Sequence, residues 1–201
     1  HPDTALPLVA RVTPHFSGEF ALRPFIDRDP PRVLDTLRAW AQHPDPHVRR
    51  LASEGSRPRL PWGARVRVAH DWALEVLEAL YADPSEYVRR SVANHLNDVS
   101  HLDADRALGL AARWMAAPGG YGAATARHGL RTLIKRGHPA ALALVGADHG
   151  AAVVVKSLTV SPDTVAIGGT VALTLTLTAE GDAPTPVVVD YRVDYVGARG
   201  T

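Results

Sequence analysis

The chain has 201 residues, of which 46% are apolar and 21% are charged, and its formal net charge is +1. These values are typical of a soluble globular protein with one large domain, or with one medium and one small domain. The lack of cysteine excludes a disulfide framework, a thiol nucleophile and cysteine-based metal sites. No run approaches the roughly 18 apolar residues that span a bilayer, so we expect a cytoplasmic protein, in a bacterial-type cytosol or nucleoid, without a membrane partner. Because the chain starts at His1 and stops at Thr201, we also expect a fragment that lacks sequence at both ends.

The first candidate site residue is Glu19, which lies in the segment Phe16-Ser-Gly-Glu-Phe-Ala-Leu-Arg-Pro-Phe25. Ser17 and Gly18 are typical helix-entry residues. Two roles are open for this acid among apolar neighbours: it caps the helix and pairs with Arg23, or it is held there for chemistry. This segment alone favours the structural role.

In the first three quarters of the chain, a block of eight residues recurs after about forty positions. His47–Glu54 reads HVRRLASE and Tyr87–Asn94 reads YVRRSVAN. An acidic-Pro turn precedes each block, an amphipathic helix (33–41 or 74–81) precedes each turn, and a weaker third copy occupies 108–135. This helix–turn–helix period is typical of HEAT or armadillo arrays. Their stacked helix pairs form a curved solenoid whose concave face suits an extended ligand.

Arginines cluster around the first block. Glu54 is the single acid between His47 and His70, whereas that segment contains six arginines and two more follow one repeat later: Arg49, Arg50, Arg57, Arg59, Arg65, Arg67, Arg89 and Arg90. Such clustering can form a phosphate-binding stripe on a nearly neutral protein. A solvated helix face explains the cluster equally well.

Glu54 is the second candidate carboxylate. Arg50 stands four residues before it, so the two side chains share a helix face and can form an ion pair. Gly55 has the place of a helix C′ residue, and an acid near the negative end of a helix dipole is unfavourable. Either the neighbouring arginines compensate for this placement, or Glu54 has a function.

The segment Arg57-Pro-Arg-Leu-Pro-Trp-Gly63 predicts a loop that two prolines stiffen. An exposed Trp62 flanked by arginines suits contact with a nucleoside beside phosphate contacts. The alternative is a tryptophan that anchors the loop to the core.

After residue 150 the composition changes to alternating Val, Thr and Ile, which indicates β-strands over 156–160, 170–178 and 187–196. Three strands do not make a stable sandwich, and an immunoglobulin-like sandwich has about seven. We therefore expect a mostly α-helical fold. A HEAT-repeat solenoid would occupy residues 1–150, with its N-terminal part missing, and an incomplete immunoglobulin-like β domain would occupy 153–201.

No metal or cofactor is expected. Pro44 and Pro46 break any helix between His43 and His47, so these two residues are not expected to share a metal ion. The chain has no Gly-rich phosphate loop and no nucleophile elbow.

Four segments strongly resemble the AlkC branch of the AlkC/AlkD DNA glycosylase family: Gly18–Phe25, Val48–Gly63, Tyr87–Asp98 and Lys135–Ala140. The resemblance covers residues 5–147. It implies base excision repair of double-stranded DNA, in which a monomer hydrolyses the N-glycosidic bond of 3-methyladenine or 3-methylcytosine. The same resemblance implies that the base is not flipped and that no cofactor takes part.

The resemblance also implies roles for single residues. Glu19 and Glu54 would be the catalytic carboxylates, and Trp62 would pack against the lesion. Arg50 would hold the DNA backbone or orient Glu54, and the other DNA-binding candidates are Arg49, Arg57, Arg59, Arg89 and Arg90. The AlkD branch has a tryptophan after the second arginine block, where this chain has Asn94 and His95, so that role does not transfer.

Two alternatives stay open. One is a catalytically inactive HEAT scaffold that binds DNA or protein, because a fold by itself does not define a function. The other is a function carried by the β domain through carbohydrate or protein binding. Convergence of the two carboxylates and Trp62 would favour the enzyme.

Overall fold

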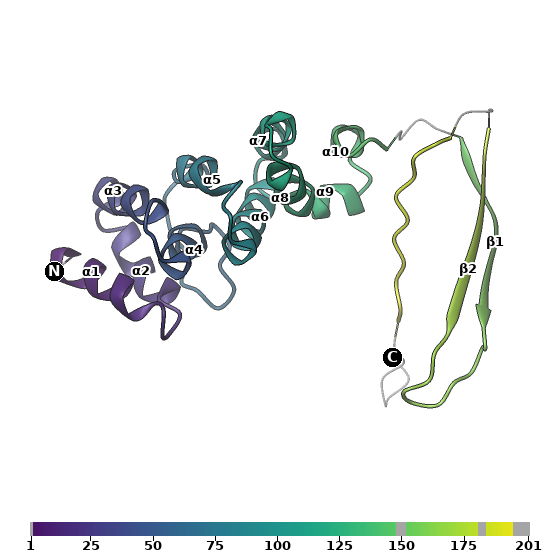
Figure 1. Cartoon of the computed structure of the whole chain (residues 1–201), viewed down its shortest axis with the longest axis horizontal. Helices are drawn as coiled ribbons and strands as arrows, with labels where there is room; N and C mark the ends of the chain where they lie inside the picture. The colour runs from purple at the N-terminus through teal and green to yellow at the C-terminus, as the bar shows by residue number, and fades with distance from the viewer. Residues whose placement is uncertain (1, 148–151, 181–183, 195–201) are drawn as a thin grey trace. The chain divides into compact units, whose positions relative to one another are not determined.

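The computed structural model describes residues 2–147, 152–180 and 184–194 and divides into two compact units, His1–Ala141 and Leu142–Thr201 (Figure 1). Each unit is described by itself. The described residues form ten helices: α1 (Pro2–Val12), α2 (Glu19–Ile26), α3 (Pro30–Ala41), α4 (Pro46–Gly55), α5 (Leu74–Leu80), α6 (Glu86–Ser100), α7 (Ala104–Ala116), α8 (Tyr121–Gly129), α9 (Arg131–Lys135) and α10 (Pro139–Leu144). The same part of the chain forms two strands, β1 (Val153–Ser161) and β2 (Ala172–Ala179).

The helices of the first unit pack in successive pairs. Helix α3 contacts α4, α5 contacts α6, and α7 contacts α8, while α2, α4, α6 and α8 also contact one another in sequence. Leucines fill the space between the helices: Leu22, Leu37, Leu51, Leu77, Leu96 and Leu110 are almost completely buried. The prediction of a mostly helical fold with helix–turn–helix pairs is confirmed, whereas the HEAT classification stays a prediction.

Short polar residues define where the helices begin. The carboxylate of Asp45 accepts a hydrogen bond of 2.8 Å from the backbone N–H of His47, and Pro46 occupies the first turn of α4. Asp29 and Asp103 cap α3 and α7 in the same way. These caps satisfy backbone donors that have no partner within the helix, and they fix the phase at which each helix starts.

Two glycines allow close approach of helices in the first unit. Gly55 is the last residue of α4, so its prediction as a C′ residue beyond the helix is wrong. A Cβ atom there would lie 2.6 Å from Leu22 Cδ2 of α2. At Gly129 an added Cβ would lie 2.6 Å from Leu96 Cδ2 of α6, and α8 ends at that glycine. The helix predicted to end at residue 135 is therefore divided into α8 and α9.

In the second unit, β1 and β2 pair antiparallel, from Val153 opposite Ala179 to Ser161 opposite Ala172. The first two predicted strands are confirmed with small changes of their ends. The third is wrong over residues 187–194, which form no strand, and residues 195 and 196 lie outside the described part of the chain. Alternating apolar residues are compatible with a strand, but a strand also needs a hydrogen-bonding partner.

Across the described ranges, no helix has the length and apolar character that crossing a membrane requires.

Candidate active site

Glu19 begins α2 and is buried, with 6% of its surface exposed. Its Oε1 atom accepts a hydrogen bond of 3.2 Å from Arg50 Nη1, and its buried Oε2 atom has no hydrogen-bond partner among the described residues. Arg23, the ion-pair partner that the sequence offered, donates instead to the backbone carbonyls of Gly55, Arg57 and Ala64. A buried polar atom without a partner is costly, and therefore this oxygen is a candidate for contact with a ligand.

Glu54 lies in the last turn of α4 and is also 6% exposed. Both of its oxygens accept hydrogen bonds: Oε1 from Arg57 Nη1 at 2.6 Å, and Oε2 from the Ser91 hydroxyl at 2.7 Å. Arg50 Nη2 lies 3.7 Å from the same Oε2 atom. These three groups hold Glu54 in one position.

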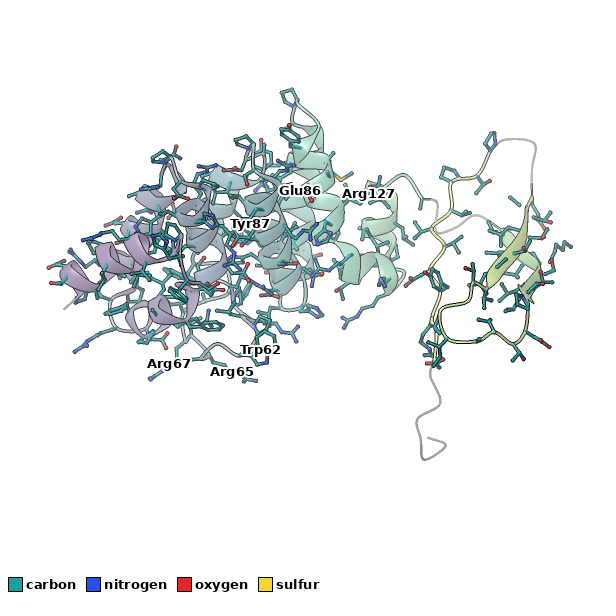
Figure 2. The ribbon with its side chains drawn as sticks, turned by 60° about the horizontal axis from the view of Figure 1, so that its bottom comes forward. Trp62, Arg65, Arg67, Glu86, Tyr87 and Arg127 are labelled. Carbon is teal, nitrogen blue, oxygen red and sulfur yellow. The ribbon has the colours of Figure 1, made fainter. Side chains whose placement is uncertain are left out.

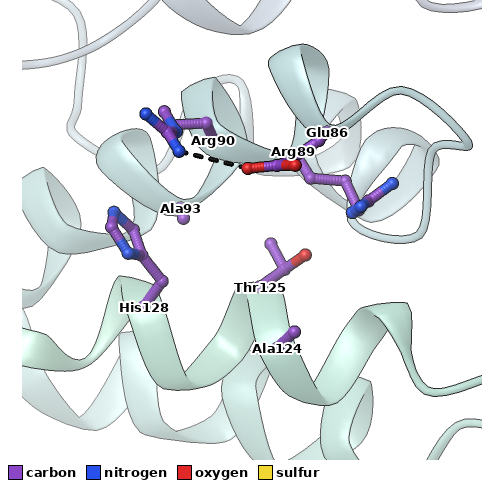
Figure 3. Close-up of a pocket in the computed structure, with 7 residues that line it drawn as sticks. All are labelled: Glu86, Arg89, Arg90, Ala93, Ala124, Thr125 and His128. Carbon is purple, nitrogen blue, oxygen red and sulfur yellow. Dashed lines mark hydrogen bonds and ion pairs between the residues drawn. The ribbon is translucent and has the colours of Figure 1, made fainter.

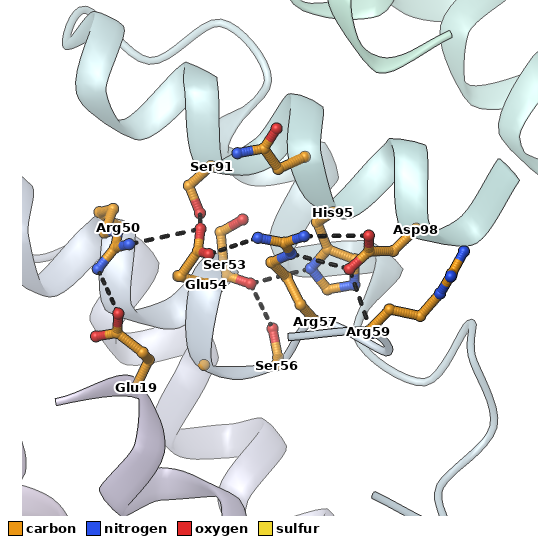
Figure 4. A network of polar contacts seen from close by, with 12 residues as sticks. Glu19, Arg50, Ser53, Glu54, Ser56, Arg57, Arg59, Ser91, His95 and Asp98 are labelled. Carbon is orange, nitrogen blue, oxygen red and sulfur yellow. Dashed lines mark hydrogen bonds and ion pairs between the residues drawn. The ribbon is translucent and has the colours of Figure 1, made fainter. Parts of the chain in front are cut away.

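Arg50 joins the two candidate carboxylates, because its guanidinium group contacts both (Figure 4). Its guanidinium carbon also lies over the ring of Tyr87, 5.3 Å from the ring centre, which is a cation–π distance. The two carboxylates come from α2 and α4 and the aromatic ring from α6, so helix packing assembles the cluster.

Arg57 is buried and lies between two acids. It forms a bidentate pair with Asp98 of α6, with Nε 2.9 Å from Oδ2 and Nη2 3.1 Å from Oδ1, in addition to its bond to Glu54. Burial lowers the pKa of Arg57, but the Asp98 hydrogen bond and the Glu54 charge outweigh burial, and the net pKa is raised. These contacts occupy Arg57 within the protein, which does not favour its predicted role in DNA binding, and they hold Glu54 in place.

Sequence reasoning missed Asp98 and Ser91, although both left a signal. Asp98 follows Arg57 by 41 residues, which is one repeat period. Ser91 stands where the first repeat has Leu51, so a polar residue replaces an apolar core residue. A comparison of the two repeats position by position would have identified both as unusual.

His95 lies beneath this network and is not a proton carrier at neutral pH. Its Nδ1 atom is 3.0 Å from the backbone carbonyl of Ser53, a partner that the sequence did not suggest. Complete burial lowers the pKa of His95 from 6.5 to about 3. The ring is therefore neutral and acts as a donor to the Ser53 carbonyl.

Trp62 is 97% exposed on the loop after α4, and its backbone has a positive φ of 58°. Figure 2 shows it with Arg65 and Arg67 along one edge of the helical unit. The alternative of a tryptophan that anchors the loop is excluded by this exposure. A large exposed aromatic residue in a sparsely populated backbone conformation is a candidate for ligand contact.

Three buried or partly buried groups fasten the loop that presents Trp62. Arg23 binds the carbonyls of Arg57 and Ala64, both at 2.6 Å. Asp98 accepts from the backbone N–H of Arg59 at 3.2 Å, and Asp27 accepts from that of Arg67 at 2.6 Å. The loop is therefore held at its start, middle and end. The ring of Trp62 does not contact Glu19 or Glu54. The two carboxylates therefore lie together without the tryptophan.

The first arginine of each repeat is structural. Arg49 donates from Nη1 to the carbonyls of His43 and Pro44 and forms a bidentate pair with Asp83. Arg89 donates from Nη1 to the carbonyls of Asp83 and Pro84 and lies 4.1 Å above the Tyr121 ring. These contacts occupy both groups within the protein, which does not favour their predicted role in phosphate binding.

Among the predicted DNA-binding residues, Arg59 and Arg90 have exposed side chains. Arg90 forms an ion pair of 3.1 Å with Glu86 and borders a cavity of about 230 Å³ between α6 and α8. Figure 3 shows Arg89, Arg90 and Glu86 at this cavity, so its wall carries two arginines and one carboxylate. A phosphate group fits this chemistry, because exposed arginines offer paired donors.

The described residues contain no group of three or more His, Asp or Glu side chains positioned to hold a metal ion.

A solved structure resembles this fold closely over nearly the whole chain. It is the Pseudomonas fluorescens alkylpurine DNA glycosylase AlkC bound to DNA containing an abasic site analog, with a TM-score of 0.82 and 42% identity. The match covers 98% of this chain and 56% of that one. The resemblance to the AlkC branch is confirmed at the level of the fold, and this protein has an AlkC-type fold.

A second comparison, with curated proteins, finds a similar protein in another bacterium. The Bacillus subtilis protein YhaZ is 36% identical over 208 residues, which cover 100% of this chain and 56% of YhaZ. Residues 154–201 match the family model described as the C-terminal Ig-like domain of the uncharacterised protein YhaZ. The chain therefore combines the AlkC-type helical fold with an Ig-like domain, and it spans about half the length of the relatives that it matches.

Proposed function

We propose that the protein is a DNA glycosylase of base excision repair. It hydrolyses the N-glycosidic bond of cationic alkylated bases, 3-methyladenine and 3-methylcytosine, in double-stranded DNA. It acts as a monomer in the cytoplasm, without base flipping and without a cofactor.

The chemistry of the lesion explains why carboxylates suffice. Alkylation at N3 places a positive charge on the base, so the base leaves with the electrons of the bond and needs no proton. The deoxyribose acquires oxocarbenium character as the bond breaks, as in glycoside hydrolysis. A nearby carboxylate stabilises that charge and activates water. An aromatic face such as Trp62 adds about 0.5–2 kcal/mol through a cation–π contact with the charged base.

The observation that carries this proposal is that two buried carboxylates from different helices, Glu19 and Glu54, both contact Arg50. A structural scaffold gains little from burying two acids side by side, because the desolvation of each charge opposes folding. The likeness to the AlkC structure, which contains DNA, supports the same function.

The test is release of 3-methyladenine from methylated duplex DNA by the full-length protein and two variants, Glu19→Gln and Glu54→Gln. We expect each variant to lose about 10²–10⁴-fold in single-turnover rate, the usual contribution of a positioned acid or base. Glu75→Gln is the matched control, because Glu75 is a carboxylate that pairs with Arg38 on the exposed side of α5.

A full-length protein that binds the methylated duplex and releases no base would contradict the proposal. That result would favour the catalytically inactive scaffold.

A further inference from the structure

Glu19 and Glu54 differ in how many of their carboxylate oxygens accept a hydrogen bond. Resting on the proposed function, we propose that Glu19 binds and deprotonates the attacking water, whereas Glu54 is a fixed anion that stabilises the sugar cation. Ser91 and the Arg57–Asp98 pair are then positioning residues, which act through Glu54 and touch no substrate.

The hydrogen bonds of Glu54 leave it little freedom. Arg57 binds one oxygen, Ser91 binds the other, and Arg50 lies 3.7 Å from that second oxygen. A general base must turn toward water and accept a proton, which would break one of these bonds. A fixed negative charge, in contrast, stabilises a developing cation without any rearrangement, which is how preorganised electrostatic groups act.

Glu19 has spare capacity as an acceptor. A single bond of 3.2 Å holds its Oε1 atom, and its Oε2 atom has no partner among the described residues. The last torsion of a glutamate side chain is broad, so a partial rotation about it turns the unpartnered oxygen toward a water molecule and loosens only that one bond. Glu19 is therefore the carboxylate able to hold a water molecule.

The proposed step balances. The water oxygen forms a bond to C1′ while the bond from C1′ to the base nitrogen breaks. The electron pair of that bond goes to the cationic base, which leaves neutral. The water proton passes to Glu19 Oε2 and then to solvent, which leaves a hydroxyl group on the sugar.

The positioning role of Ser91 and Asp98 follows from where they lie. Both belong to α6, whereas Glu54 belongs to α4, so they fix Glu54 across the packing of two helix pairs. Asp98 does not touch Glu54 and acts through Arg57, whose guanidinium it orients by two bonds of 2.9 and 3.1 Å.

Azide distinguishes the roles proposed for Glu19 and Glu54, because this small anion attacks a sugar cation without needing a general base. The full-length variants Glu19→Ala and Glu54→Ala are assayed for 3-methyladenine release with and without sodium azide. For Glu19→Ala we expect azide to raise the rate at least about tenfold, part of the 10²–10⁴-fold loss, and to yield a glycosyl azide on the DNA. For Glu54→Ala we expect no increase, since the stabilising charge is missing. Each variant is compared with itself, so partial unfolding does not mimic the result.

Ser91 is tested by kcat and KM. Ser91→Ala should lower kcat about tenfold, the effect of one hydrogen bond to a charged group, with KM unchanged. Ser91→Thr keeps the hydroxyl and should restore kcat. A merely structural role would lower the folded fraction but would leave kcat per folded molecule unchanged in Ser91→Ala. Asp98→Asn should resemble Ser91→Ala.

The outcomes separate the two proposals. If the full-length wild-type protein releases no base, the proposed function fails and this assignment with it. If the wild-type protein is active but azide affects both alanine variants equally, or only Glu54→Ala, the division of roles alone is overturned. An unchanged kcat in Ser91→Ala would overturn its positioning role.

Discussion

The two repeats of the helical unit share a sequence pattern but have different tasks. In both, the first arginine of the pair binds the backbone carbonyls five and six residues before it, as Arg49 and Arg89 show. The second arginine differs: Arg50 is partly buried and contacts two carboxylates, whereas Arg90 is exposed and pairs with Glu86. The position of Glu54 is occupied by Asn94 in the second repeat.

This difference shows that repetition builds the scaffold and that departure from repetition builds the site. The first arginine is equal in both blocks and makes the same contacts with backbone carbonyls in both. The second arginine is also equal, but it makes different contacts, and Ser91 replaces Leu51. A functional position in a repeat array is therefore found where the repeats differ in residue or in contacts.

The largest effect at neutral pH is expected from the second arginines. Arg50→Met should lower the free energy of unfolding by about 3 kcal/mol, because it leaves buried Glu19 without its ion-pair partner. Arg90→Met should change it by less than about 1 kcal/mol, since that pair is exposed. Urea unfolding of the full-length protein, followed by far-UV circular dichroism, measures both values. Equal losses in the two variants would show that the repeats do not differ as described.

A second comparison concerns His95, which occupies in α6 the place that Gly55 has in α4. Because the pKa of folded His95 is about 3 and that of an unfolded histidine is 6.5, the unfolded chain binds more protons between these values. Stability should therefore fall as the pH falls from about 6.5 toward 3, with a slope of up to about 1.4 kcal/mol per pH unit from this residue. His95→Gln should remove that part of the slope in urea unfolding measured at several pH values. Parallel curves for the two proteins would contradict this assignment.

The smallest effect on stability is expected from the two glycines at helix contacts, Gly55 and Gly129. Gly55→Ala and Gly129→Ala each place a Cβ 2.6 Å from a leucine of the neighbouring helix, and each should cost about 1–2 kcal/mol. Only Gly55→Ala pushes on α2, the helix that carries Glu19, because the leucine that it meets is Leu22 of that helix. We therefore expect a drop of about tenfold or more in 3-methyladenine release for Gly55→Ala alone. Equal activity in the two variants would show that the position of Glu19 does not depend on this contact.

Much of the fold could be predicted, because helix starts and repeat period are local properties. Asp45-Pro46 and the apolar spacing that follows place α4 without knowledge of its neighbours. The third expected strand failed because a strand needs a partner, which alternation within residues 187–196 does not provide.

The site was less predictable, because its burial depends on packing between repeats. Glu19 and Glu54 were identified as candidates, and the structure places them together. The sequence did not distinguish Arg57 from Arg59, which are separated only by Pro58: the first is buried against Asp98 and the second has an exposed side chain. Only the fold of the loop over α6 decides which of the two faces inward.

The Arg57 contact with both Glu54 and Asp98 also bears on the evolution of repeat proteins. Arrays of helix pairs grow and shrink by duplication or loss of one pair, because each pair contacts only its neighbours. The carboxylate cluster, however, draws on α2, α4 and α6 together. Copying any single pair would therefore not create a second site. Pairs added at the far end, beyond α8, would lengthen the array without altering it, so the length of the array and its chemistry can change independently.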